Sequence, residues 1–154
     1  MGVYDASGHA CDTSGKGAQC AERVWIMSVT QLAEMHTYMR PAGSGSEREF
    51  CARYIAPLPG AYQDEYGNWH VKVTEDPVLW SCHTDTVHRK QGRQRVRVSD
   101  KGLLRLHKRS KQSNCLGADD TVGVYLLCEM IRAKVPGYYI FHFGEEQGCV
   151  GSHA

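Results

Sequence analysis

The sequence predicts an α/β fold in which a mixed, mostly parallel sheet is flanked by helices. Two apolar stretches, 78–82 and 138–143, have the length of buried strands. Between them, residues 121–133 form a helical stretch that is apolar on most sides and should therefore be buried against the sheet. The order strand, helix, strand is typical of a crossover unit, and such sheets place their ligand sites at the carboxyl ends of the strands.

The length and composition favour one globular domain. A chain of 154 residues can bury a core, and a formal net charge of +1 gives no global bias toward nucleic acid or an anionic membrane. There is no apolar run near the roughly 20 residues that span a bilayer, and the first 25 residues lack a secretory signal. We therefore expect a cytoplasmic protein without a membrane partner.

The seven cysteines favour the same compartment. Their number is odd, there is no Cys-x-x-Cys pair, and Cys82 and Cys128 lie inside apolar runs. A cysteine in such a position is typically a small core residue, so we expect reduced thiols.

The amino-terminal third begins with a leader. Residues 1–19 are rich in Gly, Ser, Asp and Ala without periodicity, which predicts a mobile leader, and 20–154 form the domain. Apolar residues recur at helical spacing over 21–39, and 40–43 should end that helix. His36, on this helix, is expected at the surface or partly packed.

A second helix and a hairpin follow. Ser46 with Glu49 resembles a capping box and predicts a helix that runs to about Ile55. Residues 62–73 alternate about Gly67-Asn68, which predicts a tight hairpin.

The segment 89–111 is strongly basic, with ten Lys or Arg and a single Asp100. Alternation over 95–106 about the turn at 100–102 predicts a second hairpin with one wet face. A basic hairpin can contact nucleic acid, but no aromatic residues are interleaved for base stacking. A solvated face is the better interpretation, and nucleic acid is not the expected partner.

Polar residues that can hold a metal follow each predicted strand or precede the helix. His83 and Asp85 end the first strand, Asp119 and Asp120 precede the helix, and 145–146 is a glutamate pair after the second strand. Zinc accepts imidazole nitrogen and carboxylate oxygen, and catalytic zinc keeps a position open for water. The sequence therefore predicts a metal site at this edge of the sheet.

Geometry divides the roles of these carboxylates. Residues two apart on a strand lie about 6–7 Å apart, so Asp85 is better placed to orient His83 than to share its metal. Adjacent side chains diverge, so one residue of each acidic pair can ligate metal. The other aspartate then holds the turn, and the other glutamate can serve as general base toward a metal-bound water.

Three stretches resemble the successive metal-site motifs of the co-catalytic di-zinc exopeptidases, in particular the branch with peptidase T and the carboxypeptidase G-like and acylase-like enzymes. They are 83–87 (HTDTV), 116–124 (LGADDTVGV) and 144–152 (GEEQGCVGS), and 64–68 resembles the hairpin that precedes the first ligand there. The resemblance covers about residues 27 to 154, the amino-terminal part of the catalytic domain.

The resemblance implies a role for each residue of the site. His83 would ligate one zinc ion, Asp119 would bridge two, and Glu146 would ligate the other. Asp85 would orient the histidine and Glu145 would act as general base, with a cis peptide bond between Asp119 and Asp120. The family also uses a later acidic residue and a late histidine that do not occur before Ala154, so the fold and the site are expected to be incomplete.

These inferences predict a zinc-dependent metallopeptidase or amidohydrolase that cleaves short peptides or N-acylated amino acids. One alternative is a catalytically incomplete fragment or subunit that binds metal and assembles with a complementing carboxyl-terminal chain or with a copy of itself. Another is a mononuclear zinc module completed by His142, Cys149 or His153. A last alternative treats the three motifs as ordinary polar loops.

Overall fold

The computed structural model describes residues 29–153. The expected leader, 1–19, and the first part of the helix expected over 21–39 lie outside the described residues. Within the described part, no helix is long and apolar enough to cross a membrane.

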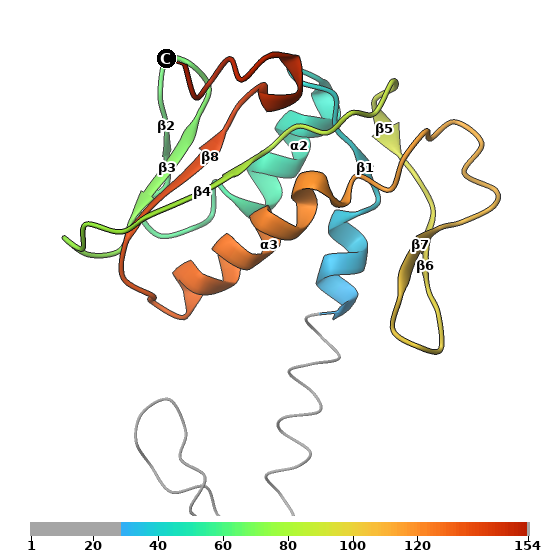
Figure 1. The fold of residues 1–154 in the computed structure, drawn as a ribbon, viewed down its shortest axis with the longest axis horizontal. Helices are drawn as coiled ribbons and strands as arrows, with labels where there is room; N and C mark the ends of the chain where they lie inside the picture. Colours follow the sequence, from blue (N-terminus) through green and yellow to red (C-terminus); the bar gives the residue numbers. More distant parts are fainter. Residues whose placement is uncertain (1–28, 154) are drawn as a thin grey trace, which may run out of the picture. The chain divides into compact units, whose positions relative to one another are not determined.

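Four strands form the main sheet, in the order β2–β3–β8–β4 (Figure 1). They are β2 (Tyr62–Gln63), β3 (Trp69–Lys72), β4 (Leu79–His83) and β8 (Tyr138–His142). β4 runs parallel to β8, and the other two pairings are antiparallel. The predicted mixed sheet and the hairpin of β2 and β3 are confirmed, although the described part is less parallel than expected.

Helix α3 (Ala118–Arg132) connects β4 to its parallel neighbour β8, as the crossover unit predicts. The apolar residues of α3 are not all buried, because Val122 is 39% and Leu126 51% exposed. One face only is buried, and its apolar members are Val124, Leu127, Cys128 and Ile131.

Helix α2 (Gly45–Tyr54) begins earlier than the expected capping box. Ser44, not Ser46, is the N-cap, and its hydroxyl accepts a hydrogen bond from the Glu47 N–H at 3.2 Å. Glu47 reaches back to accept from the Gly43 N–H at 2.6 Å. The first contact satisfies one of the donors that a helix start leaves free, and the second ties the residue before the N-cap to the first turn.

Both helices pack on one face of the sheet. Cys128 on α3 donates a weak hydrogen bond to the carbonyl of Tyr54 on α2, so the two helices are neighbours. Their apolar residues share one core cluster with a row of side chains from the strands: Val71, Cys82, Tyr139 and Phe141. The expectation that Cys82 and Cys128 are core residues is confirmed.

The opposite face of the sheet is open in the described part of the chain. Leu79 is 58% exposed, and β4 is an edge strand. The expectation that 78–82 is a fully buried strand is therefore wrong. Length and apolar composition identify a strand, but burial depends on what packs against it.

The segment before α2 also differs from the expected helix. Residues 29–35 are helical, and Tyr38–Met39 then form strand β1, which pairs with β5 (Gly92–Arg93). The helix therefore ends before Met39, because a pairing distant in sequence replaces its last turn. His36 is 1% exposed, so the expectation that it lies at the surface or is partly packed is wrong.

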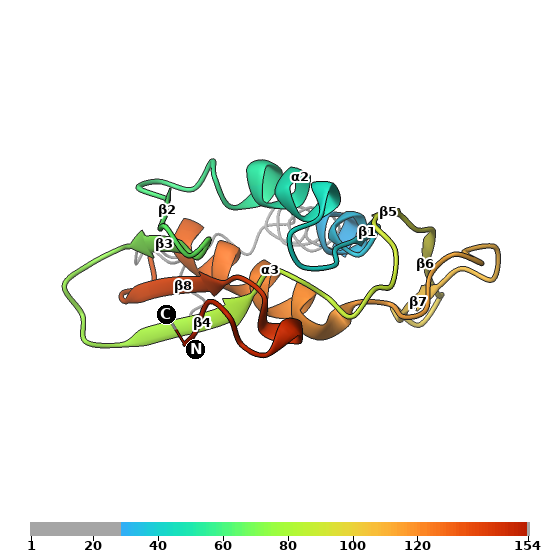
Figure 2. The same cartoon turned by 90° about the horizontal axis from the view of Figure 1, so that it is seen from above.

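The predicted basic hairpin is confirmed as β6 (Val96–Val98) and β7 (Leu104–Leu106). It forms a two-stranded sheet of its own and lies beyond the end of the main sheet in both views (Figures 1 and 2).

Candidate metal centre

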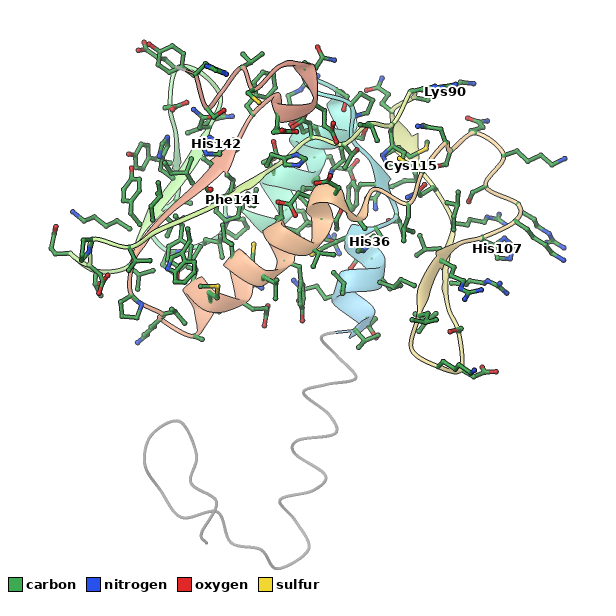
Figure 3. All side chains as sticks on the ribbon, viewed as in Figure 1. His36, Lys90, His107, Cys115, Phe141 and His142 are labelled. Atoms are coloured by element: carbon green, nitrogen blue, oxygen red, sulfur yellow. The ribbon has the colours of Figure 1, made fainter. Side chains whose placement is uncertain are left out.

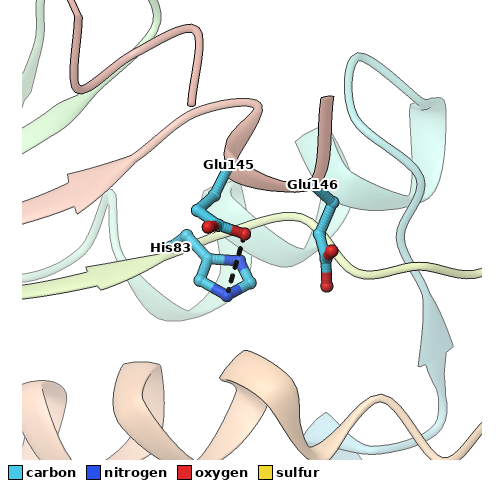
Figure 4. A group of neighbouring side chains, drawn as sticks. All are labelled: His83, Glu145 and Glu146. Carbon is cyan, nitrogen blue, oxygen red and sulfur yellow. Dashed lines mark ion pairs between the residues drawn. The ribbon is translucent and has the colours of Figure 1, made fainter. Parts of the chain in front are cut away.

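A histidine and two glutamates converge where β4 and β8 end (Figure 4). His83 is the last residue of β4, and Glu145 and Glu146 lie on the short 3-10 helix η1 (Glu145–Gln147). Each residue offers one ligand atom, and these atoms lie within 4.8 Å of one another. His83 is buried and the glutamates are half-buried, so the group opens toward solvent on the glutamate side.

The start of α3 adds a fourth side chain. Asp119 Oδ1 lies 3.0 Å from His83 Nε2, whereas Asp120 Oδ1 accepts a hydrogen bond from the Gly123 N–H at 2.8 Å. The peptide bond between the two aspartates is cis, as the resemblance implies. One aspartate therefore faces the histidine while its neighbour caps the helix.

Asp85 ties the parts of this centre together. Its side chain is fully buried, and its two carboxylate oxygens accept from the N–H groups of Glu145 at 3.1 Å and Glu146 at 3.0 Å. His83 Nδ1 lies 3.4 Å from the same carboxylate and donates to the Asp85 carbonyl at 3.1 Å. Because Nδ1 is the donor, Nε2 is the nitrogen that can hold a metal.

The charges of the centre follow from these contacts. Burial alone lowers the pKa of His83, but hydrogen bonds to Asp85 and Asp119 outweigh it and raise this pKa to about 9. Burial raises the pKa of Asp85, yet hydrogen bonds from His83 and the glutamate N–H groups leave that pKa below its ordinary value. Without metal, His83 therefore carries a proton that a metal ion would displace.

The hairpin of β2 and β3 supports the glutamate turn from behind. Asn68 Oδ1 accepts from the Phe143 N–H and Asn68 Nδ2 donates to the Gly151 carbonyl, each at 3.0 Å. Asp64 accepts from Asn68 and from His70. Burial alone raises the pKa of Asp64, but its hydrogen bonds to His70 and Asn68 lower that pKa to about 2.

Two buried charges near the centre were not anticipated from the sequence. Glu47 accepts a 2.6 Å hydrogen bond from the hydroxyl of Thr84, next to His83. Arg40 is fully buried, donates to Thr121 at 2.8 Å, and has a pKa lowered to about 10 by burial. No role was expected for Glu47 from the sequence, because the expected capping box was Ser46 with Glu49, and Arg40 was interpreted as part of the helix end.

The alternative ligands lie outside the group of three. His142 on β8 (Figure 3) has a half-exposed side chain, and its Nδ1 has no hydrogen-bond partner in residues 29–153. The Cys149 thiol donates a weak hydrogen bond to the Glu145 carboxylate at 3.7 Å, and His153 is exposed.

The donors fit a zinc ion. The imidazole nitrogen of His83 lies close to carboxylate oxygens of η1 and to Asp119 at the start of α3, and these donor types are the ligand chemistry of catalytic zinc. The contacts of Asp85 hold the histidine ring and the backbone of the turn that carries both glutamates, as outer contacts of metal sites typically do.

Comparisons with known proteins agree with this architecture. No protein-family model and no curated protein matches the chain. Among solved structures, a tripeptidase from Staphylococcus aureus subsp. aureus Mu50 is similar, with a TM-score of 0.63 and 22% sequence identity over 82% of this chain. The match covers 38% of the tripeptidase. The chain therefore has an α/β fold shared with part of a peptidase.

Proposed function

We propose that the chain carries the metal centre of a zinc-dependent hydrolase that cleaves short peptides or N-acylated amino acids. The observation that supports this most directly is the convergence of His83, Glu145 and Glu146 at the carboxyl end of the parallel strands, with Asp119 beside His83. The shared fold with a tripeptidase supports the same reaction class.

In this proposal His83 Nε2, Asp119 and Glu146 would hold two zinc ions. When bound, zinc would act as a Lewis acid and lower the pKa of a water ligand to about 7. Glu145 takes a proton from the attacking water and passes it to the leaving amine nitrogen. Asp85 holds the histidine ring and, through the two glutamate N–H groups, the turn that carries both glutamates.

The assignment of Glu145 is tested by Glu145→Gln in a preparation that cleaves a tripeptide. We expect at least a roughly hundredfold loss of turnover, because an amide cannot accept the proton, with zinc content unchanged. Glu75→Gln is the matched control, since Glu75 is exposed and, within residues 29–153, pairs only with Lys72. Activity near that of the control would place the base elsewhere.

A second candidate function is that of a metal-binding subunit or fragment that assembles with a complementing carboxyl-terminal chain or a second copy. Counting the bridge twice, His83, Asp119 and Glu146 supply four metal bonds, whereas two catalytic zinc ions need about six. The open face and free edge of β4, with Leu79 58% exposed, favour assembly.

Light scattering, zinc content and tripeptide cleavage of the purified chain distinguish the two candidates. Assembly predicts a mass above that of one chain, or weak cleavage that rises steeply with protein concentration. Full cleavage by a monomer would exclude the second candidate.

We further propose a cytoplasmic setting. The five described cysteines (51, 82, 115, 128 and 149) are free thiols, which supports a reducing compartment.

A further inference from the structure

The basic residues of the chain are concentrated in one segment that the metal centre does not use. Residues 89–111 hold ten of the 18 lysines and arginines but one of the 17 acidic residues, which leaves eight basic and 16 acidic residues elsewhere. Blue-tipped side chains project from β6, β7 and the loop that follows them (Figure 3). Positive charge concentrated in one segment attracts anionic ligands.

A cavity of about 220 Å³ lies between β5 and the loop after β7. Four cationic side chains line it: Arg93, Arg95, Arg109 and Lys111. Arg93 is already engaged, because it donates to Glu49 at 2.6 Å and stacks over the ring of Tyr38. The other three form no ion pair or side-chain hydrogen bond with any residue in 29–153.

The frame of this cavity is fixed by hydrogen bonds. The Arg95 N–H donates to the Ser110 hydroxyl at 2.7 Å, and that hydroxyl donates back to the Arg95 carbonyl at 2.9 Å. Gln94 is buried and donates to the carbonyls of His36 and Leu116. The backbone that carries the cations is therefore organised before a ligand arrives, which reduces the ordering cost of binding.

The chemistry of the cavity selects the ligand class. A single carboxylate neutralises only one of the three free charges, whereas a phosphate or pyrophosphate group has more negative charge and more acceptor oxygens to pair with all of them. The cavity is smaller than the roughly 300–1,000 Å³ typical of sites for drug-sized ligands. There is no Phe, Tyr or Trp in residues 87–113 for stacking with nucleic acid bases.

We propose that Arg95, Arg109 and Lys111 form a binding site for a phosphate group of a small molecule or a lipid headgroup. The site does not depend on the metal centre, so its test is independent of hydrolysis.

The test measures binding of inorganic pyrophosphate to the full chain by calorimetry, after a chelator and desalting have removed metal that would itself bind the probe. The pocket variant carries Arg95→Gln, Arg109→Gln and Lys111→Gln. The matched control carries Arg97→Gln, Lys101→Gln and Arg105→Gln, which remove the same charge from the hairpin outside the cavity.

We expect the pocket variant to lose at least about tenfold in affinity, since charge-assisted hydrogen bonds are removed. The control should change by less than about threefold, because exposed charges at a distance are screened. Circular dichroism verifies that both variants fold, and a variant with Arg95→Lys and Arg109→Lys should keep most of the affinity.

A parallel arm uses phosphatidylcholine vesicles with and without phosphatidylinositol phosphate. If the chain binds the vesicles that contain phosphatidylinositol phosphate but not pyrophosphate, and only the pocket variant loses this binding, the phosphate belongs to a lipid. If the pocket and control variants lose the same affinity, binding is due to general charge attraction, and the proposal is overturned. Absence of binding to both probes would overturn it as well.

Discussion

Gly151 lies directly behind the turn that carries the two glutamates, and the change Gly151→Ala tests how tightly that turn is held. A Cβ at this position would lie 2.1 Å from Asn68 Oδ1 and 2.6 Å from the Phe143 carbonyl oxygen. Real Cβ contacts do not fall below 3.0 Å, and one of the two neighbours is backbone. Asn68 must therefore give up its hydrogen bonds, or the turn must move.

Overpacking of this kind costs about 1–3 kcal/mol, and a weakened hydrogen bond adds about 1 kcal/mol. We therefore expect Gly151→Ala to lower the free energy of unfolding by about 2–4 kcal/mol, or the Tm by roughly 5–15 °C. Zinc affinity should fall as well, because Glu145 and Glu146 move with the turn. Urea unfolding and a zinc titration measure the two effects.

Gly45→Ala is the matched control. Its added Cβ would meet ordinary contacts, 3.4 Å from Gln91 and 3.9 Å from Arg48, so we expect a change below about 0.5 kcal/mol. If Gly151→Ala behaves like this control in both measurements, the contact between Asn68 and the turn does not position the glutamates.

Three further predictions concern the polar contacts behind the centre. Asp85→Asn, which replaces one acceptor oxygen with an NH₂ group facing a backbone donor, should weaken zinc binding by roughly 10–100-fold in a titration against a chelator; unchanged binding would remove Asp85 from the centre. Asp64 has a folded pKa of about 2 against an ordinary 3.8, so its contribution to stability is complete above about pH 4 and is lost as the pH falls toward 2. Asp64→Asn should flatten urea-unfolding stability over that window, and a His70→Gln variant that keeps the full acid loss would show that His70 is not responsible for the low pKa. Glu47→Gln places an amide donor against either the Thr84 hydroxyl or a backbone N–H and should cost about 1–3 kcal/mol in urea unfolding, whereas Thr84→Ser should cost less.

The elements that the sequence predicts well are those determined by local pattern. Apolar runs identified β4 and β8, and alternation about a turn identified both hairpins. The acidic pairs and the histidine meet because each follows a strand or begins the crossover helix, so parallel pairing brings them to one edge.

The features that were missed depend on residues distant in sequence. Tyr38 and Met39 continue a helical period, yet they pair with β5 across more than fifty positions. Ser44 and Ser46 each have a hydroxyl that could cap the helix. Ser44 is the N-cap in the structure, where Glu47 also contacts Gly43 and Thr84. No local pattern reports which of two similar caps will be used.

Burial was also overestimated from composition. Leu79 and Leu126 belong to apolar runs, but each is more than half exposed in the described part of the chain. A run of apolar residues gives the type of element, whereas its partners decide which side is covered.

The most direct test of the metal centre is a zinc titration of the purified, metal-free chain and of His83→Ala, with His107→Ala as the control because His107 lies just beyond β7, on the basic hairpin. The proposed centre uses His83 Nε2 as a zinc ligand, and among the described residues no other imidazole belongs to the convergent group. We expect the control to bind zinc like the wild type and His83→Ala to bind at least about tenfold more weakly. Equal zinc affinity in all three proteins would contradict a metal centre built on His83.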